Sequence, residues 1–229
     1  MEKLLTSIFG ETCFFCGEPG RLICYSCESK IRLCQNGVCI LCQNKTVLGY
    51  SHTACQSGIF NSRVPTQLCS VYEYGGYASQ VVKKSKYKPK RFALLRLLSS
   101  SGAKLASKLG FDFPGFVVVP IPISKSREKD RGFNQAEIIA KAICKEFNLL
   151  MDSKLVIRAK DTSKQFGLQK EARAVNIAGA FVASNRAQGG RFLLVDDICT
   201  TGATLIEASR ALYAVGALDV RCFSLLRKI

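Results

Sequence analysis

Long apolar runs, acidic residues and histidine are all scarce in this sequence. No apolar stretch approaches the roughly 20 uncharged residues that a membrane-spanning helix needs. The segment Met1–Leu5 does not begin a secretory apolar region. From these absences we expect a soluble, cytoplasmic protein and not a membrane-spanning or secreted one. The single histidine, His52, leaves one imidazole for any metal site, so further ligands must come from other residue types.

The shortage of acidic residues makes the chain strongly basic. Its 229 residues include 33 lysines and arginines against 17 acids, a formal net charge of +16 at pH 7. Residues 1–70 hold six cations and four acids, so an excess of +14 falls in residues 71–229. Such an excess favours a polyanionic ligand for the larger part. The length allows one full domain and a small appendage, and 48% hydrophobic residues suffice for a buried core.

Cysteine, in contrast, is abundant and clustered near the N-terminus. The chain has 12 cysteines, and residues 13–55 contain four pairs of metal-ligand residues, each separated by two residues. In a chain without a secretory segment, such pairs indicate reduced thiols that bind metal. Each pair offers two ligands from one tight turn, and a tetrahedral zinc site needs two turns. The predicted ligands are Cys13, Cys16, Cys24, Cys27, Cys39, Cys42, His52 and Cys55.

Two pairings of these four turns are possible. Sequential pairing joins the first turn with the second and the third with the fourth, whereas interleaved pairing joins the first with the third and the second with the fourth. We prefer the sequential arrangement because a shorter loop closes at lower entropic cost, although the difference is only about 1 kcal/mol. Cys34 is an alternative ligand to His52. The thiols Cys69, Cys144, Cys199 and Cys222 lie in apolar segments and are interpreted as small hydrophobic residues.

The segment from Phe192 to Leu205 carries the strongest functional signal. Phe192–Val195 predicts a strand buried on both faces, and the apolar period from Ala203 onward predicts a helix. Unpaired amides at the start of such a helix favour phosphate, while Asp196 and Asp197 suit sugar hydroxyls or a divalent cation. The alternative is an ordinary helix cap, but a cap needs one acid and no threonine-rich turn. The segment predicts a site for a phosphorylated ribose, formed by Asp196, Asp197, Thr200, Thr201, Gly202, Ala203 and Thr204.

Strands and helices alternate through the rest of the chain. Helices are predicted over Tyr77–Leu109, broken around Pro89, and after a charged loop, Ser124–Ala136, up to Asn148. A further short helix is predicted to end at Asn176. Additional strands are predicted within Phe116–Pro122, Leu155–Arg158, Gly179–Ala183 and Leu218–Leu226. The alternation predicts an open parallel α/β sheet flanked by helices. We therefore expect two domains, a zinc-ribbon domain over residues 1–70 and an α/β domain over residues 71–229.

A basic run without acids spans the break between the two predicted helices. It comprises Lys83, Lys84, Lys86, Lys88, Lys90, Arg91 and Arg96, interleaved with Tyr87 and Phe92. A charge run of this kind is often a solvated helix face. The interleaved aromatic rings also suit a single-stranded nucleic acid, because bases stack on rings while cations neutralise phosphates.

The order Val-Asp-Asp-x-x-Thr-Thr-Gly-x-Thr resembles the signature of type I phosphoribosyltransferases, which bind phosphoribosyl pyrophosphate with Mg²⁺. This resemblance implies that Asp196 and Asp197 meet the ribose hydroxyls and that the threonine turn wraps the 5′-phosphate. Nearly the whole chain resembles the ComF family, which pairs an N-terminal double zinc ribbon with a type I phosphoribosyltransferase fold and is linked to DNA uptake in natural competence. The resemblance rests on the Cys13–Cys55 ladder, Tyr74–Gly76, Val119–Pro122, Arg131–Gln135, Arg158–Thr162, Gln165–Leu168, Asn176–Phe181 and Asp196–Thr204. His52 stands where family members usually have a cysteine.

Two functions are compatible with these features. A DNA-uptake protein would bind single-stranded DNA through its cations, keep the phosphoribosyl pyrophosphate site, and act with other proteins of the uptake machinery. An active phosphoribosyltransferase would fix the ribose with Asp196, Asp197 and Mg²⁺ and neutralise the departing pyrophosphate. The cations predicted for this catalytic role are Lys125, Arg127, Lys129 and Arg131. We favour the first function, with salvage of an unidentified base or nucleotide as the alternative. A zinc-stabilised adaptor is a third possibility.

Overall fold

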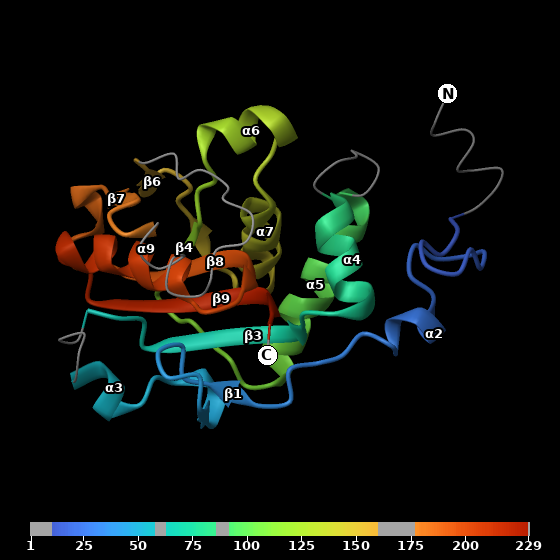
Figure 1. Ribbon diagram of the computed structural model, residues 1–229, viewed down its shortest axis with the longest axis horizontal. Coiled ribbons are helices and arrows are strands. Elements are labelled where there is room, and N and C mark those ends of the chain that lie inside the picture. Colours follow the sequence, from blue (N-terminus) through green and yellow to red (C-terminus); the bar gives the residue numbers. More distant parts are fainter. Residues whose placement is uncertain (1–10, 58–62, 86–91, 160–176, 229) are drawn as a thin grey trace.

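The computed structural model describes residues 11–57, 63–85, 92–159 and 177–228. At its centre is a parallel sheet of five strands in the order β3-β9-β8-β4-β5 (Figure 1). These strands are β3 (Gln67–Glu73), β9 (Asp219–Arg227), β8 (Arg191–Cys199), β4 (Val117–Pro120) and β5 (Leu150–Met151). The predicted parallel α/β fold is therefore confirmed.

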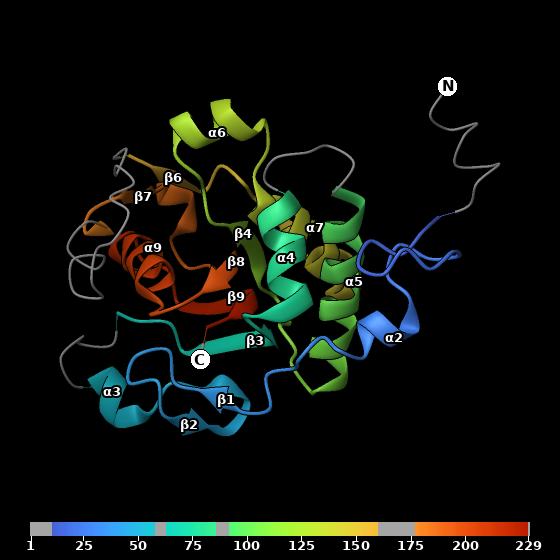
Figure 2. The ribbon, with the colours of Figure 1, turned by 45° about the vertical axis from the view of Figure 1, so that its right-hand side comes forward.

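Helices cover both faces of this sheet, as Figures 1 and 2 show. Leu193 and Val195 of β8 share one buried cluster with residues of three helices, whereas Leu194, which points to the opposite face, belongs to a second cluster with the fourth helix. The three helices of the first face are α4 (Gly76–Ser85), α5 (Phe92–Lys108) and α7 (Gln135–Phe147), and the fourth is α9 (Ala203–Ala214). This double cover explains why β8 is apolar without alternation.

Most predicted helices are confirmed. Helices α4 and α5 correspond to the two helices expected within Tyr77–Leu109. The expected break at Pro89 lies outside the described residues. Helix α7 ends one residue before Asn148, which adopts a left-handed conformation (φ 53°). The short helix expected to end at Asn176 also lies outside the described residues. None of the helices in the described ranges is long and apolar enough to cross a membrane.

Two expectations about the chain between β4 and β8 are wrong. The charged segment Ser124–Ala136 is not all loop, because it contains α6 (Lys125–Arg131). The Ser124 hydroxyl accepts a hydrogen bond from the backbone N–H of Arg127 at 3.4 Å, and Gly132 ends the helix in a left-handed conformation. Local capping therefore makes a helix out of a sequence with little apolar character.

The second correction concerns β6 (Val156–Arg158) and β7 (Phe181–Ala183). They pair antiparallel in a separate two-stranded sheet and do not join the parallel sheet. The central residues of both strands, Ile157 and Val182, are 56% and 51% exposed, so only one face of this sheet is buried. Strands covered on one side suit an antiparallel pair, whereas a parallel sheet needs cover on both sides. A 3-10 turn, η3 (Asn185–Ala187), connects β7 to the segment before β8.

The N-terminal segment follows the outer edge of the sheet. Its short elements are α2 (Tyr25–Glu28), the antiparallel pair β1 (Gly37–Val38) and β2 (Lys45–Thr46), η1 (Val47–Gly49) and α3 (Thr53–Ser57). Between α2 and β1, the backbone N–H of Cys34 donates to the carbonyl of Val71 at 2.8 Å. The segment thus caps the free edge of β3, which would otherwise expose unpaired backbone groups. Strand β3 begins at Gln67, close to the domain boundary expected at residue 70.

Candidate ligand and metal sites

The paired acids lie on β8 beyond the end of its neighbour β4. Strand β4 pairs with β8 only as far as Pro120 opposite Val195, whereas β9 continues alongside β8 to Cys199. Asp196 and Asp197 are half-buried, and the Asp197 backbone N–H donates to Asp196 Oδ1 at 2.8 Å. The two acids therefore lie at the carboxyl end of the sheet, where α/β proteins of this topology bind their ligands.

A threonine-rich turn connects these acids to α9. Gly202 has φ +79°, a left-handed conformation that favours glycine, and immediately precedes the first residue of α9. The Thr201 hydroxyl accepts the backbone N–H of Ala203 at 3.4 Å. Thr200, Thr201 and Thr204 are half-buried. Hydroxyls and the first amides of a 12-residue helix form a favourable environment for an anion, and the neighbouring carboxylate oxygens suit Mg²⁺.

The cations expected to meet pyrophosphate lie on another element. Lys125, Arg127, Lys129 and Arg131 belong to α6, which follows β4 through residues 121–124. In both views α6 lies at the top of the molecule (Figures 1 and 2). Arg127 and Arg131 are half-buried, and Lys129 is exposed. Their neutralising role remains a prediction, because it depends on where a bound ligand would lie between α6 and the turn.

The motif Arg131–Gln135 has a structural role that the sequence did not reveal. The Asn134 Oδ1 accepts a hydrogen bond from the backbone N–H of Ala136, the second residue of α7, and Asn134 Nδ2 donates to the Ile121 carbonyl at 2.9 Å. Gln135, 3% exposed, donates to the Val82 carbonyl at 2.8 Å and to Ser85 Oγ at 2.7 Å. These bonds join the connection after β4, the start of α7 and the end of α4. The only hint of this role in the sequence is the pair of amide side chains, Asn134 and Gln135, at the predicted start of a helix.

The predicted metal ligands converge into two clusters. One contains Cys13, Cys16, Cys24 and Cys27, and the other contains Cys39, Cys42, His52 and Cys55. Within each cluster the ligand atoms all lie within 4.8 Å of one another. Tetrahedral zinc with Zn–S bonds of about 2.3 Å separates its sulfurs by about 3.8 Å, so both clusters fit this ion. Sequential pairing is confirmed, and the interleaved arrangement is wrong.

Backbone amides prepare one thiol in each cluster for metal binding. Burial acts to raise the pKa of Cys13, but backbone N–H groups of Cys24, Cys16 and Phe15 outweigh it and lower the pKa to about 6. Burial likewise opposes ionisation of Cys39, and backbone donors from its own turn and from His52 lower the pKa to about 6. Because zinc binds the thiolate, these donors favour the ligand form of both cysteines.

The other cysteines stand apart from both clusters. Cys34, the alternative to His52, instead pairs through its backbone with β3, and burial raises its pKa to about 11. Cys69 and Cys222 are fully buried in the apolar clusters. Cys199 is 2% exposed, and burial raises its pKa to about 12, so the thiol is neutral. Cys69, Cys199 and Cys222, together with Cys144, which is half-buried against an apolar cluster, fit the predicted role as small hydrophobic residues.

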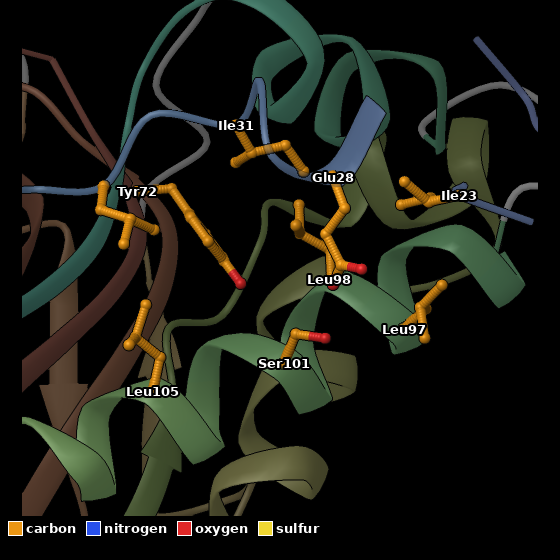
Figure 3. Close-up of a pocket in the computed structure, with 9 residues that line it drawn as sticks. Ile23, Glu28, Ile31, Tyr72, Leu97, Leu98, Ser101 and Leu105 are labelled. Atoms are coloured by element: carbon orange, nitrogen blue, oxygen red, sulfur yellow. The ribbon is translucent and has the colours of Figure 1, made fainter. Parts of the chain in front are cut away.

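A separate cavity of about 200 Å³ lies between residues of the segment 23–33 and α5 (Figure 3). Three polar groups reach its wall, from Glu28, Ser101 and Tyr72, and burial raises the pKa of the Tyr72 hydroxyl. The remaining lining residues are apolar: Ile23, Ile31, Leu33, Leu97, Leu98 and Leu105. A carboxylate in an apolar wall disfavours a phosphorylated ligand, so this cavity does not compete with the turn as a phosphate site.

The sheet, the paired acids and the threonine turn define a phosphoribosyltransferase domain, and the family model described as "Phosphoribosyl transferase domain" matches residues 129–229. Almost the whole chain is similar to the Competence protein ComFC of Bacillus subtilis, with 31% identity over 217 residues, covering 92% of this chain and 86% of that protein. The chain belongs to the ComF family.

Further relatives are similar over most of this chain. The DNA utilization protein YhgH of Escherichia coli is 26% identical, covering 92% of this chain and 98% of that protein. Competence protein F of Haemophilus influenzae is 25% identical, covering 89% of this chain and 96% of that protein. Among solved structures, adenine phosphoribosyltransferase from Leishmania tarentolae aligns with 15% identity and a TM-score of 0.32, covering 69% of this chain and 91% of that one.

Proposed function

We propose that the protein serves the uptake or use of DNA and that its Asp196–Thr204 segment binds phosphoribosyl pyrophosphate with Mg²⁺. The observation that carries this proposal is the continuation of β8 beyond β4, which places two carboxylates next to a threonine turn and the first amides of α9. The names of the relatives, which refer to competence and DNA utilization, support the cellular role.

The proposed roles follow from the chemistry of each group. The carboxylates of Asp196 and Asp197 accept hydrogen bonds from the ribose hydroxyls, and the threonine hydroxyls with the α9 amides bind the 5′-phosphate. Bound Mg²⁺ supplies positive charge to the pyrophosphate. The cations of α6 add to that charge if the ligand reaches them. Calorimetric titration with phosphoribosyl pyrophosphate tests the site, and we expect tighter binding with Mg²⁺ than without it. Absence of binding under both conditions would contradict the proposal.

A separate question is whether the protein also catalyses transfer of the phosphoribosyl group. The cations on α6 favour an active phosphoribosyltransferase, because stabilising a departing pyrophosphate accelerates transfer. Release of pyrophosphate in the presence of candidate bases, measured with a coupled assay, distinguishes an enzyme from a protein that only binds the ligand. Repeating the calorimetric titration with single-stranded DNA present tests whether the two ligands influence each other.

Single-stranded DNA binding is proposed through the basic run that begins at the end of α4. Lys83 and Lys84 are exposed, with their ammonium groups 5.2 Å and 4.9 Å from the ring centres of Tyr74 and Phe14. Phe92, expected to stack on bases, instead packs edge-to-face against Phe133 with ring centroids 4.1 Å apart. Lys86, Tyr87, Lys88, Lys90 and Arg91 lie outside the described residues. Neutralisation of DNA phosphates by lysine therefore supports the proposal more strongly than stacking of bases on aromatic rings does.

This proposal predicts a steep salt dependence. Each single-strand phosphate that is neutralised contributes roughly −0.7 to the log–log slope of affinity against salt. Replacing Lys83, Lys84 and Lys86 by Gln should therefore flatten the slope by about two units. Fluorescence anisotropy with a labelled single-stranded oligonucleotide, repeated at several salt concentrations, measures this slope. The matched control replaces three other lysines, the exposed Lys104, Lys108 and Lys145, by Gln. Equal slopes in the two triple variants would place any bound DNA elsewhere.

A further inference from the structure

The second metal cluster lies directly against the proposed phosphate turn. Strands β1 and β2 flank the Cys39–Cys42 turn of this cluster, and Figure 2 shows both of them beside β3, the edge strand of the sheet. The cluster's first turn is tight, because the backbone N–H of Gln43 donates to the Cys39 carbonyl at 2.9 Å. Ile40, inside this turn, is completely buried. An apolar side chain between two metal ligands is therefore packed into the body of the protein.

Ile40 fills the space beside Gly202. A Cβ atom added to Gly202 would lie 2.7 Å from Ile40 Cγ1 and 3.3 Å from the Ile40 carbonyl oxygen. Ile40 also belongs to the buried cluster that contains Cys199, at the end of β8, and Leu205, in the first turn of α9. Ile40 thus packs against Gly202 and shares its buried cluster with residues before and after the threonine turn.

A polar connection runs alongside this apolar contact. Arg227, 5% exposed, donates through Nη2 to Gln43 Oε1 at 2.8 Å, and Gln43 Nε2 donates to the Ile40 carbonyl at 2.6 Å. Arg227 is also the register partner of Cys199 in the sheet. The last paired residues of β8 and β9 are therefore tied to the same metal-binding turn.

Resting on the proposed function, we propose that the second metal cluster positions the phosphate turn. Metal bound to Cys39, Cys42, His52 and Cys55 fixes the conformation of the Cys39–Cys42 turn, which contains Ile40. Ile40 in turn restricts the movement of Gly202 and the start of α9. Ile40 is a positioning residue, because it acts on the ligand only through the turn. The first metal cluster lacks such a contact in the described residues, since its buried members share the cluster of the opposite sheet face.

Matched cysteine variants test this difference between the clusters. Cys42 and Cys16 are both exposed, so Cys42→Ser and Cys16→Ser remove equivalent ligands from the second and first clusters. Metal analysis should show one zinc ion fewer in either variant. Hydrogen–deuterium exchange of the peptide covering residues 199–205, without ligand, should accelerate at least tenfold in Cys42→Ser alone. Affinity for phosphoribosyl pyrophosphate should fall about tenfold in Cys42→Ser and stay within twofold in Cys16→Ser.

Variants of Ile40 keep the proposal testable if Cys42→Ser does not fold. Ile40→Ala should retain both zinc ions yet accelerate exchange in residues 199–205, whereas Ile40→Val, which keeps the branched Cβ, should remain close to wild type. The control Ile23→Ala removes an equally buried isoleucine next to Cys24, and exchange of the turn should not change. Equal exchange in Ile40→Ala and Ile23→Ala, or in the two cysteine variants, would overturn the proposal. Because exchange needs no ligand, a wild-type protein that fails to bind phosphoribosyl pyrophosphate would contradict the proposed function separately.

Discussion

Replacing Asp196 and Asp197 together by Asn is expected to abolish binding of phosphoribosyl pyrophosphate without unfolding the protein. Each hydrogen bond falls from the roughly 1.5–3 kcal/mol of a charged acceptor to the roughly 0.5–1.5 kcal/mol of a neutral one, so the two changes should weaken binding at least about thirtyfold, before the loss of the negative charge that would attract Mg²⁺ is counted. The fold should persist because both acids are only half-buried. The hydrogen bond from the Asp197 backbone N–H to Asp196 Oδ1 needs an acceptor oxygen that an Asn side chain still offers.

The measurement is calorimetric titration with Mg²⁺ present, accompanied by a thermal melt of each variant. A control should make the same change of two charges elsewhere. Glu11→Gln with Glu146→Gln serves this purpose, since Glu11 is exposed, Glu146 is half-buried on α7, and neither belongs to the turn. The control should bind like wild type. Unchanged affinity and unchanged melting in the aspartate variant would show that the turn is not the ligand site.

Removing the first metal cluster should unfold the segment around it and leave the sheet intact. Residues 11–30 contribute few buried side chains, namely Cys13, Ile23, Cys24 and Cys27, and three of these are themselves ligands. A structural zinc ion contributes about 10–16 kcal/mol of apparent binding free energy in small zinc domains, which so small a core cannot replace. The stacked rings of Phe15 and Tyr77, 4.1 Å between centroids, would remain as an isolated contact.

The variant that tests this replaces Cys13 and Cys16 by Ser. We expect zinc content to fall from two ions to one per chain, and hydrogen exchange to become fast in residues 11–30 but to stay slow in β8 and β9. Cys34→Ser is the matched control, because Cys34 lies outside both clusters, and it should retain both ions. Less than one zinc per chain in the native protein would refute the assignment of both clusters.

Local spacing made much of this protein predictable. A ligand pair separated by two residues forms one tight turn wherever it occurs, so the spacing alone predicted the eight residues that converge in the two clusters, with Cys34 as the alternative to His52. Strand β8 is apolar throughout Phe192–Val195, and such a run needs burial on both faces, which implies helices on each side. The order of two acids, three threonines and a glycine likewise depends on only nine residues of chain.

The sequence by itself thus determined the cysteine and histidine pairs and the parallel sheet, and it predicted the phosphate turn, since each depends on neighbours within a few residues. Only the tertiary structure placed Ile40 against Gly202 and Gln43 against Arg227, contacts that join residues more than 150 positions apart. It also placed β6 and β7 outside the parallel sheet and Cys34 outside both cysteine clusters. Packing of distant surfaces is decided by shape and burial over the whole fold, and no local period or spacing encodes it.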